Sequence, residues 1–411
     1  MRLLSLLFLA GTALATSSYF PDHVSTFRNI QVGPRPFYLV EDMDDSSLKS
    51  QLSSCSEKPV HYAPTFSISH RGAPLQFPEH SREGMLAAAR QGAGIIECDV
   101  TLTKDHRLVC RHSQCDLHTT TNILTIPSLA AKCTEPFSPA SHTKPAAAKC
   151  CTSDITLAEF KSLCAKMDSG NASAVTPEDY QHGGQLWRTE LYNQCGTLVE
   201  HTEYIKLIDS LGLQFSPELK AAETVAHFNG NNVQEAYAQQ MIDDYKNLNI
   251  NPSRVWPQSF SEAAILYWIQ HEPDFGKQAV YLDQRVDTPS GYAEAVASLS
   301  RLQQQGVRIM APPIFALLNT SEDGEIISSE YARVAKDAGL SLFAWSLERS
   351  GPIKLAAAAG DYYFQSIAGV LHKDGDIYRI LDALVNKAGV KGIFSDWPGT
   401  VTYYANCMGL W

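Results

Sequence analysis

The sequence predicts an α/β protein, a (β/α)8 TIM barrel with a cysteine-rich insertion after the second strand. From residue 65 onward, short apolar runs alternate with helix-like stretches, a rhythm typical of parallel strands with crossover helices. About eight strand candidates occur over roughly 340 residues, which fits one closed barrel. An open doubly wound sheet is the alternative, but no G-x-G-x-x-G motif follows the first strand.

The strand candidates follow one another at regular intervals. In chain order they are TFSIS, GIIECDV, LGLQFSPE, SRVWPQSF, QAVYLD, VRIMAPP, LSLFAWSL and VKGIFSD. Segments with helical periodicity separate them, such as SREGMLAAARQG after the first and SEAAILYWIQ after the fourth. The stretch 113–200 breaks the rhythm with an excess of Ser, Thr, Pro and Cys, so we place it as an excursion between the second and third strands.

The N-terminus has the three parts of a secretory signal peptide, for which we expect residues 1–15. Arg2 is positively charged, residues 3–14 are apolar but too few to span a bilayer, and Ala13 and Ala15 are small residues at the cleavage positions. An uncleaved anchor is the alternative. We expect residues 16–64 to form an arm packed on the barrel, which occupies 65–411. Because no later segment is long and apolar enough for a membrane helix, we expect a secreted, extracellular protein without stable membrane insertion.

The charge of the chain narrows the class of partner. The formal net charge of -11 argues against nucleic acid, because binding to phosphate backbones needs a basic surface. A small anionic substrate remains compatible with this charge, since it experiences only the local field of its pocket.

The cysteines indicate an oxidising compartment, where disulfides persist. Six of the ten lie within the insertion: Cys115, Cys133, Cys150, Cys151, Cys164 and Cys195. We expect them to pair with one another, although the sequence leaves the pairing open. A zinc site at the adjacent Cys150 and Cys151 is less favoured, because they lack C-x2-C spacing and nearby paired histidines. Asn171 and Asn319 are acceptors for N-glycosylation, which predicts a glycoprotein.

Carboxylates gather where the predicted strands end, the edge at which barrels of this type carry their chemistry. Glu97 and Asp99 are two residues apart on the second strand, so both point to one face and Cys98 to the other. Glu218, at the end of the third strand, would add a third oxygen ligand. Buried carboxylates repel one another, and an all-oxygen set suits a hard cation, Mg²⁺ or Ca²⁺.

A structural alternative is a buried salt-bridge network in which Glu97 and Asp99 pair with Arg71 and Lys220. The two interpretations are compatible, because metal sites often carry cationic side chains around their ligands.

Two histidines at strand ends, His70 and His112, flank these carboxylates. A pair of imidazoles can serve as general acid and general base near neutral pH, although a lone histidine is more often structural. Arg71 offers a planar fork to a phosphate and Lys220 a point charge. Together these groups indicate phosphoryl transfer. Because the insertion departs next to His112, we also expect it to wall one side of the site.

The combined order of motifs resembles the glycerophosphodiester phosphodiesterases. The matching pieces are HRG with a following PE, GAGIIECDVTLTKD, LVCRH, PELK and FSDWP, from about residue 65 to 400. The cysteine-rich insertion resembles that of the secreted, fungal-type branch of the family. The chain departs from the family at His80, where P-E-N-T is common, and at Ser113, where H-D is common.

The resemblance implies a (β/α)8 barrel and a role for each candidate residue. It implies that His70 and His112 form an acid-base pair and that Arg71 and Lys220 bind the phosphate. It also implies that the metal ligands are Glu97, Asp99 and Glu218. Glu79 matches an acidic residue near the metal ligands. Glu79 is therefore a candidate for contact with the substrate or with the residues around the metal ligands. Phe260 and Trp345 are candidates for the same kind of contact.

The implied activity is metal-dependent hydrolysis of glycerophosphodiesters, such as glycerophosphocholine, to glycerol 3-phosphate and an alcohol. The family's route uses the two histidines and a cyclic phosphate. A phospholipase-D-like enzyme acting on intact lyso- or sphingolipids is an alternative, which an exposed apolar rim would favour. A secreted binding protein without activity is a further alternative, but the full set of candidate residues argues against it.

Overall fold

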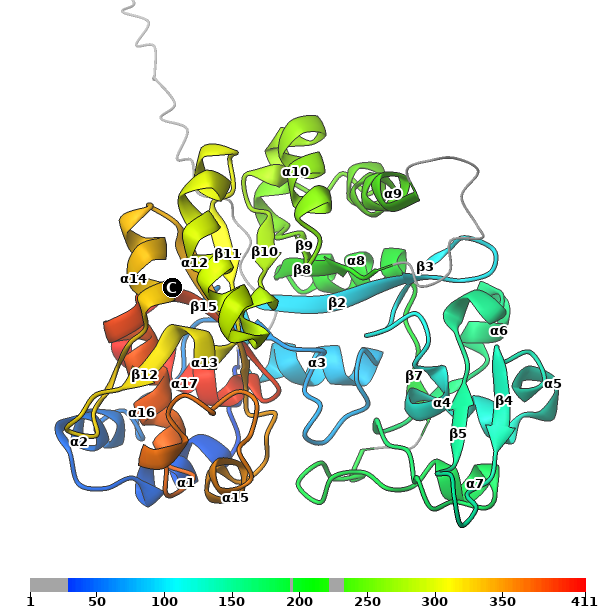
Figure 1. Cartoon of the computed structure of the whole chain (residues 1–411), viewed down its shortest axis with the longest axis horizontal. Coiled ribbons are helices and arrows are strands. Elements are labelled where there is room, and N and C mark those ends of the chain that lie inside the picture. Colours follow the sequence, from blue (N-terminus) through cyan, green and yellow to red (C-terminus); the bar gives the residue numbers. More distant parts are fainter. Residues whose placement is uncertain (1–28, 193–194, 222–232) are drawn as a thin grey trace, which may run out of the picture.

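The computed structural model describes residues 29–192, 195–221 and 233–411, and it has the predicted (β/α)8 barrel (Figure 1). The barrel strands are β1 (Ser67–Ser69), β2 (Ile95–Leu102), β8 (Gln214–Leu219), β9 (Gln258–Ser259), β10 (Val280–Leu282), β11 (Ile309–Ala311), β14 (Ser341–Leu347) and β15 (Val390–Ser395). They pair in parallel in chain order, and β1 pairs with both β2 and β15, which closes the sheet. An open doubly wound sheet would have two edges, so this alternative is wrong.

Helices between the strands cover the outside of the barrel (Figure 1). They are α3 (Arg82–Arg90), α8 (His201–Ser210), α9 (Val233–Asn247), α10 (Glu262–His271), α11 (Pro273–Gly276), α12 (Pro289–Gln304), α13 (Ile314–Leu317), α14 (Glu330–Asp337), α15 (Ile353–Ala358), α16 (Asp376–Ala383) and α17 (Pro398–Met408). The short strands β12 (Leu318–Thr320) and β13 (Ile326–Ser328) form a hairpin before α14. In α14 the hydroxyl of Ser329 accepts a hydrogen bond from the backbone of Ala332, and Tyr331, Ala332 and Ala335 are buried. A capped N-terminus and one apolar face therefore define this helix.

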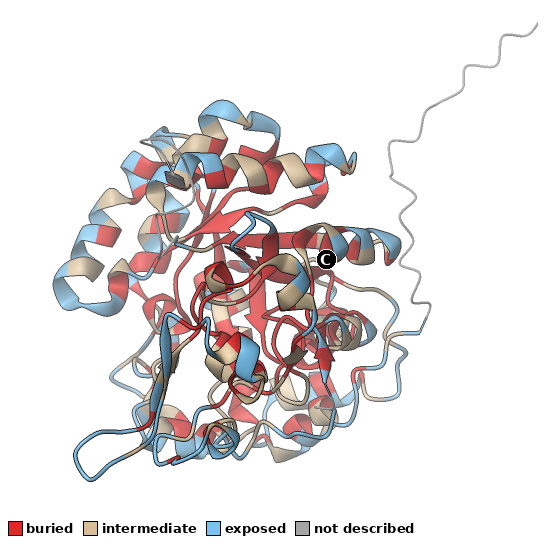
Figure 2. Cartoon of the chain, turned by 90° about the vertical axis from the view of Figure 1, so that its right-hand side faces the viewer, coloured by how far each residue is buried: buried red, intermediate tan, exposed pale blue. Residues whose placement is uncertain are grey.

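Apolar side chains fill the barrel interior, and the strands at the centre are almost entirely buried (Figure 2). The inward-facing cluster consists of Ile68, Ile95, Val280, Leu282, Ile309, Ala311, Phe343 and Phe394. Phe260 and Trp345 pack against this cluster and also line a cavity at the carboxyl ends of the strands. The packed interior thus forms a floor beneath that cavity.

Two helices precede the barrel in the chain, α1 (Arg35–Asp42) and α2 (Ser47–Ser53), and both contact α17. A disulfide joins Cys55 to Cys407 near the C-terminus, and Arg35 forms an ion pair of 2.5 Å with Glu348. The predicted signal peptide, residues 1–15, lies outside the described residues. Among the described helices, none combines the length and the apolar character needed to cross a membrane.

The insertion follows β3 (Leu108–Cys110), a separate short strand that pairs antiparallel with β2, and it ends before α8. It appears as a lobe at the side of the barrel (Figure 1). Its elements are α4 (Leu117–Thr120), α5 (Pro127–Ala130), β4 (Glu135–Ser138), β5 (Ala147–Lys149), α6 (Leu157–Lys161), β6 (Cys164–Ala165), α7 (Pro177–Tyr180) and β7 (Gly196–Thr197). Its buried apolar side chains, such as Ile123, Phe160 and Leu163, form a cluster of their own.

Disulfides hold this insertion together. The pairs are Cys115–Cys151, Cys133–Cys150 and Cys164–Cys195, which confirms that the six cysteines pair with one another. They span 36, 17 and 31 residues. By loop-closure entropy, bridges of this span each stabilise the fold by about 3–4 kcal/mol. A further disulfide, Cys98–Cys110, joins β2 to β3 beside the candidate ligands.

Candidate active site

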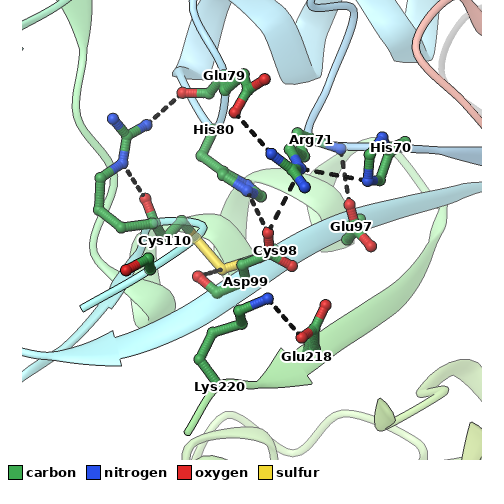
Figure 3. Close-up of polar contacts among 12 residues, drawn as sticks. His70, Arg71, Glu79, His80, Glu97, Cys98, Asp99, Cys110, Glu218 and Lys220 are labelled. Carbon is green, nitrogen blue, oxygen red and sulfur yellow. Dashed lines mark hydrogen bonds and ion pairs between the residues drawn. A yellow bond between two sulfur atoms is a disulfide. The ribbon is translucent and has the colours of Figure 1, made fainter. Parts of the chain in front are cut away.

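Three carboxylates meet where the middle of β2 lies beside the end of β8 (Figure 3). Glu97 and Asp99 lie on β2, and the register places Asp99 directly opposite Glu218 on β8. One oxygen of each carboxylate lies within 4.8 Å of the others, and all three side chains are buried. The two-residue period of β2 therefore places its two carboxylates on one face, while Cys98 points away and forms its disulfide.

Crowding of these carboxylates changes their protonation. Burial, together with the charges of Asp99 and Glu218, raises the pKa of Glu97 well above its usual range. Burial and the charge of Asp99 raise the pKa of Glu218 to about 8, against the lowering effect of Lys220. For Asp99, burial is outweighed by His80 and Lys220, and its pKa lies well below the usual range. Without a cation, the group would hold at least one proton at neutral pH.

The donor set fits a hard divalent cation. Asp99 Oδ1 is buried and has no hydrogen-bond partner within the described part of the chain. The oxygens of Glu97 accept hydrogen bonds from the Arg71 backbone and from Gln258 Nε2, both at 2.8 Å, which fix the carboxylate in place. An all-oxygen set that contains a buried oxygen without a hydrogen bond is suited to Mg²⁺ or Ca²⁺.

Cationic side chains stand around the same carboxylates. Lys220 Nζ lies 2.6 Å from Glu218, and Arg71 Nε lies 3.8 Å from Asp99. Part of the salt-bridge alternative is therefore present, although Glu97 meets the backbone of Arg71 and not its guanidinium. Such pairing is compatible with a cation site, because cationic groups commonly surround metal ligands.

His70 stands at the end of β1 with both ring nitrogens engaged. Its Nδ1 lies 2.5 Å from Asp396 Oδ1, and Arg71 Nε donates to its Nε2 at 3.2 Å. These partners assign a neutral ring whose Nδ1–H donates to Asp396. Burial and the charge of Arg71 lower the pKa of His70 to about 4, although Asp396 opposes the shift. The acceptor nitrogen Nε2 points toward Arg71, and both residues line the same cavity.

His112 follows β3 and lines the same cavity as His70. Burial and the positive charges of Arg71 and Lys220 hold the pKa of His112 well below its usual range. A bound anion near these two cations would offset their charge, so it would shift this pKa upward.

Three arginines converge on the buried carboxylate of Glu79. Arg71 lies 3.1 Å, Arg188 2.8 Å and Arg349 3.2 Å from its oxygens. Burial alone would raise the pKa of Glu79, but Arg71, Arg349 and Arg188 hold it well below the usual range. Glu79 thus positions Arg71, whose guanidinium also lies 3.8 Å from the candidate cation ligand Asp99.

Arg349 extends this contact to the histidine. It also lies 2.9 Å from Asp396, the residue that holds His70. Ion pairs therefore run from Arg188 in the insertion through Glu79 and Arg349 to Asp396, which accepts the hydrogen bond of the neutral His70 ring.

The insertion reaches the site differently from what the sequence predicted. None of its described residues 113–200 lines the cavity, so the expected wall is wrong; its contribution is Arg188. Side chains of this segment anchor it on the barrel, because Arg188 Nε donates to Pro74 O and Trp187 Nε1 to Arg349 O. Arg188 and Arg349 were missed by sequence reasoning, because neither belongs to a motif at a strand end.

His80 is a second residue that the sequence pattern left without a role. Its Nε2 lies 2.8 Å from Asp99 Oδ2, and it has a left-handed backbone with φ of 53°. Asparagine, common in the family at this position, and histidine are both enriched in this conformation. The shared backbone requirement explains how histidine replaces asparagine here, where it orients a candidate cation ligand.

These groups open into one cavity of about 720 Å³. Its polar end is lined by His70, Arg71, Glu97, His112, Glu218 and Lys220. Aromatic side chains, including the predicted Phe260 and Trp345, line the remainder together with polar and aliphatic residues such as Gln284 and Leu282. Asp99 lies beneath the polar end as the third carboxylate, and Glu79 stands behind Arg71. The structure thus brings all the predicted site residues together, eight of them in the cavity wall.

Comparisons with known proteins identify the family of this chain and several relatives. The model described as the glycerophosphoryl diester phosphodiesterase family matches residues 70–400. An "Extracellular protein" of Arthroderma benhamiae is 48% identical over 245 residues, which are 59% of this chain and 100% of the relative. A "Probable glycerophosphodiester phosphodiesterase 1" of Mycobacterium tuberculosis is 45% identical over 49 residues, 12% of this chain and 18% of the relative.

One solved structure supports the fold. A "Putative glycerophosphoryl diester phosphodiesterase" from Silicibacter pomeroyi DSS-3 aligns with a TM-score of 0.53 at 19% identity, over 84% of this chain and 93% of its own. At this identity the likeness concerns the barrel alone. The range matched by the family model contains every residue of the candidate site.

Proposed function

Because the chain belongs to the glycerophosphoryl diester phosphodiesterase family, we propose that it hydrolyses glycerophosphodiesters, such as glycerophosphocholine, to glycerol 3-phosphate and an alcohol. One observation carries the proposal: a single cavity joins two cationic side chains, two histidines and a cluster of three carboxylates, of which Glu97 and Glu218 line the wall and Asp99 lies beneath it. These are the parts that transfer of a phosphoryl group needs, namely charge neutralisation, orientation and proton transfer.

Glu97, Asp99 and Glu218 would hold the divalent cation, Mg²⁺ or Ca²⁺. When bound, the cation supplies positive charge that neutralises the phosphate and polarises its oxygens. Arg71 and Lys220 bind the remaining phosphate oxygens. Arg71 is oriented for this by Glu79, and Lys220 by Glu218.

His70 and His112 carry the protons. One of them accepts the proton of the glycerol 2-hydroxyl, whose oxygen attacks phosphorus, and the other protonates the leaving alcohol. The two exchange roles when water opens the resulting cyclic phosphate. Asp396 fixes the Nδ1–H tautomer of His70, so Nε2 is the nitrogen that exchanges a proton with the substrate.

An assay with glycerophosphocholine tests this proposal directly. We expect the purified protein to release glycerol 3-phosphate, to lose this activity with EDTA, and to regain it with Mg²⁺ or Ca²⁺. Activity that is unchanged by EDTA would contradict the cation's role, and an absence of product would contradict the reaction itself.

A phospholipase-D-like reaction on lysolipids is a second candidate, favoured by apolar surface beside the site. A second cavity of about 640 Å³ lies between insertion and barrel, lined by Trp187, Leu355 and by Tyr363, which also lines the first. Leu186 and Leu355 are 98% and 64% exposed. Faster turnover of lysophosphatidylcholine than of glycerophosphocholine would support this candidate over the first.

We also propose that the chain is a secreted glycoprotein. The relative named "Extracellular protein" supports secretion, as do five disulfides that leave no free cysteine among the described residues. Asn171 and Asn319 are the proposed glycosylated residues. A mass decrease on treatment with an N-glycosidase tests this part.

Arg188→Met is expected to lower kcat about tenfold, because truncating a buried charge-paired group loosens the ion pairs that position Arg71 and His70. Cation affinity should stay near wild type, because Arg188 does not contact the carboxylates that form the cation site. Arg188→Lys should restore part of kcat. Arg107→Met, which removes an exposed arginine paired with Glu200 just before β3, serves as the matched control. Unchanged kcat in a folded Arg188→Met variant would contradict this role.

A further inference from the structure

Four aromatic rings line the cavity beside its polar end: Phe260, Trp345, Tyr362 and Tyr363, which we call the aromatic wall. The centroid of Trp345 lies 5.8 Å from Phe260, 6.1 Å from Tyr362 and 6.0 Å from Tyr363. The indole is fixed, because its Nε1 donates to Ala311 O at 2.7 Å. The wall is thus a connected, held surface.

The wall runs in a definite direction away from the phosphate-binding groups. Lys220 Nζ lies 5.8 Å from the centre of the Phe260 ring, so Phe260 is at the phosphate end. Trp345 packs next to Phe260, and Tyr362 packs next to Trp345, as the centroid distances above show. The hydroxyl of Tyr362 donates to Asp287 Oδ1 at 2.6 Å, which places a carboxylate at the far end.

Positively and negatively charged side chains lie at opposite ends of the aromatic wall. The cationic residues that line the cavity, Arg71 and Lys220, both lie at its polar end. Asp287 lies beyond the aromatic wall and is exposed at the rim of the cavity. Among the described carboxylates that line the cavity, it is the one that does not belong to the cation site. Aromatic faces and a carboxylate attract a positive charge, and aromatic surfaces are the common recognition device for quaternary ammonium groups.

We propose that the aromatic wall and Asp287 form the subsite for the leaving alcohol and select head groups that carry an ammonium charge. This inference rests on the proposed function, because it places the phosphate at Arg71 and Lys220. From there the head group extends over Phe260 and Trp345 toward Asp287. Polyol head groups gain no charge attraction here, and head groups with a carboxylate are repelled by Asp287.

A substrate analogue with carbon in place of the quaternary nitrogen separates the effect of the charge from the effect of size. Glycerophosphocholine is compared with glycerophospho-3,3-dimethylbutanol, in which carbon replaces the quaternary nitrogen at nearly constant size. We expect kcat/KM to be at least tenfold higher for the choline ester. Equal values for the two esters would overturn the inference and leave the proposed function intact, whereas hydrolysis of neither ester would contradict the proposed function.

Further substrates and variants locate the effect. Glycerophosphoethanolamine should keep part of the preference, and glycerophosphoserine should be the poorest. Asp287→Asn and Tyr362→Leu should each reduce the ratio between choline ester and isostere severalfold, while Asp323→Asn, an exposed carboxylate outside the cavity, should leave it unchanged. If neither Asp287→Asn nor Tyr362→Leu changes the ratio between choline ester and isostere, and both variants melt near the wild-type temperature, the assigned position is contradicted.

Discussion

Replacing His70 or His112 by alanine is expected to lower kcat by about 10²-fold or more, the usual size of a general acid-base contribution. KM should change much less, because the benefit of proton transfer is realised mainly in the transition state. The double variant should lose less than the product of the two single losses, since either change already interrupts the relay. The measurement is kcat and KM on glycerophosphocholine for both single variants and the double variant.

Thermal melting beside the kinetics separates catalysis from folding. Neither imidazole is a proposed cation ligand, so cation binding should be retained. A structural histidine would behave in the opposite way, with lower stability and near-normal turnover per folded molecule. His142→Ala, an exposed histidine of the insertion, is the matched control. Near-normal kcat in either site variant would remove that histidine from the mechanism.

The sequence was sufficient to predict residues whose positions follow from the strands. Side chains at the ends of parallel strands must meet at one rim, so Glu97, Asp99 and Glu218 could be placed together from strand order and the two-residue period. His70 followed from the same argument, as the first residue after β1.

Residues positioned by loops could not be predicted in this way. Arg188 is 109 residues from Glu79 in the chain, and only the fold of a disulfide-bonded insertion brings them within 2.8 Å. Tyr362 and Tyr363 come after α15, some distance beyond the end of β14, so no strand pattern pointed to them. The tandem aromatic pair, which follows the alanine run 356–359 by two residues, was the signal that could have been used.

Cation affinity is expected to rise with pH between about 6 and 8. The pKa of Glu218 is raised to about 8 by burial and Asp99, so below this pH its proton must leave before the oxygen can bind a cation. Each proton released makes affinity about tenfold stronger per pH unit below the pKa, and the dependence levels off above it. Titration calorimetry with Ca²⁺ or Mg²⁺ at pH 6, 7 and 8 measures this slope. The raised pKa of Glu97 acts in the same direction.

Glu218→Gln tests the same site by substitution. The amide keeps the size of the side chain but removes one charge and the titrating proton, so we expect affinity to fall by about 100-fold or more and its pH dependence to flatten. Turnover of glycerophosphocholine should fall with cation occupancy and recover in part at high cation concentration. Asp209→Asn, which changes an exposed carboxylate paired with Arg254, should match wild type in both measurements. Unaltered affinity in Glu218→Gln, or a preference for zinc over hard cations at these carboxylates, would refute the site, because three oxygen donors from β2 and β8 leave a soft metal no sulfur or nitrogen ligand.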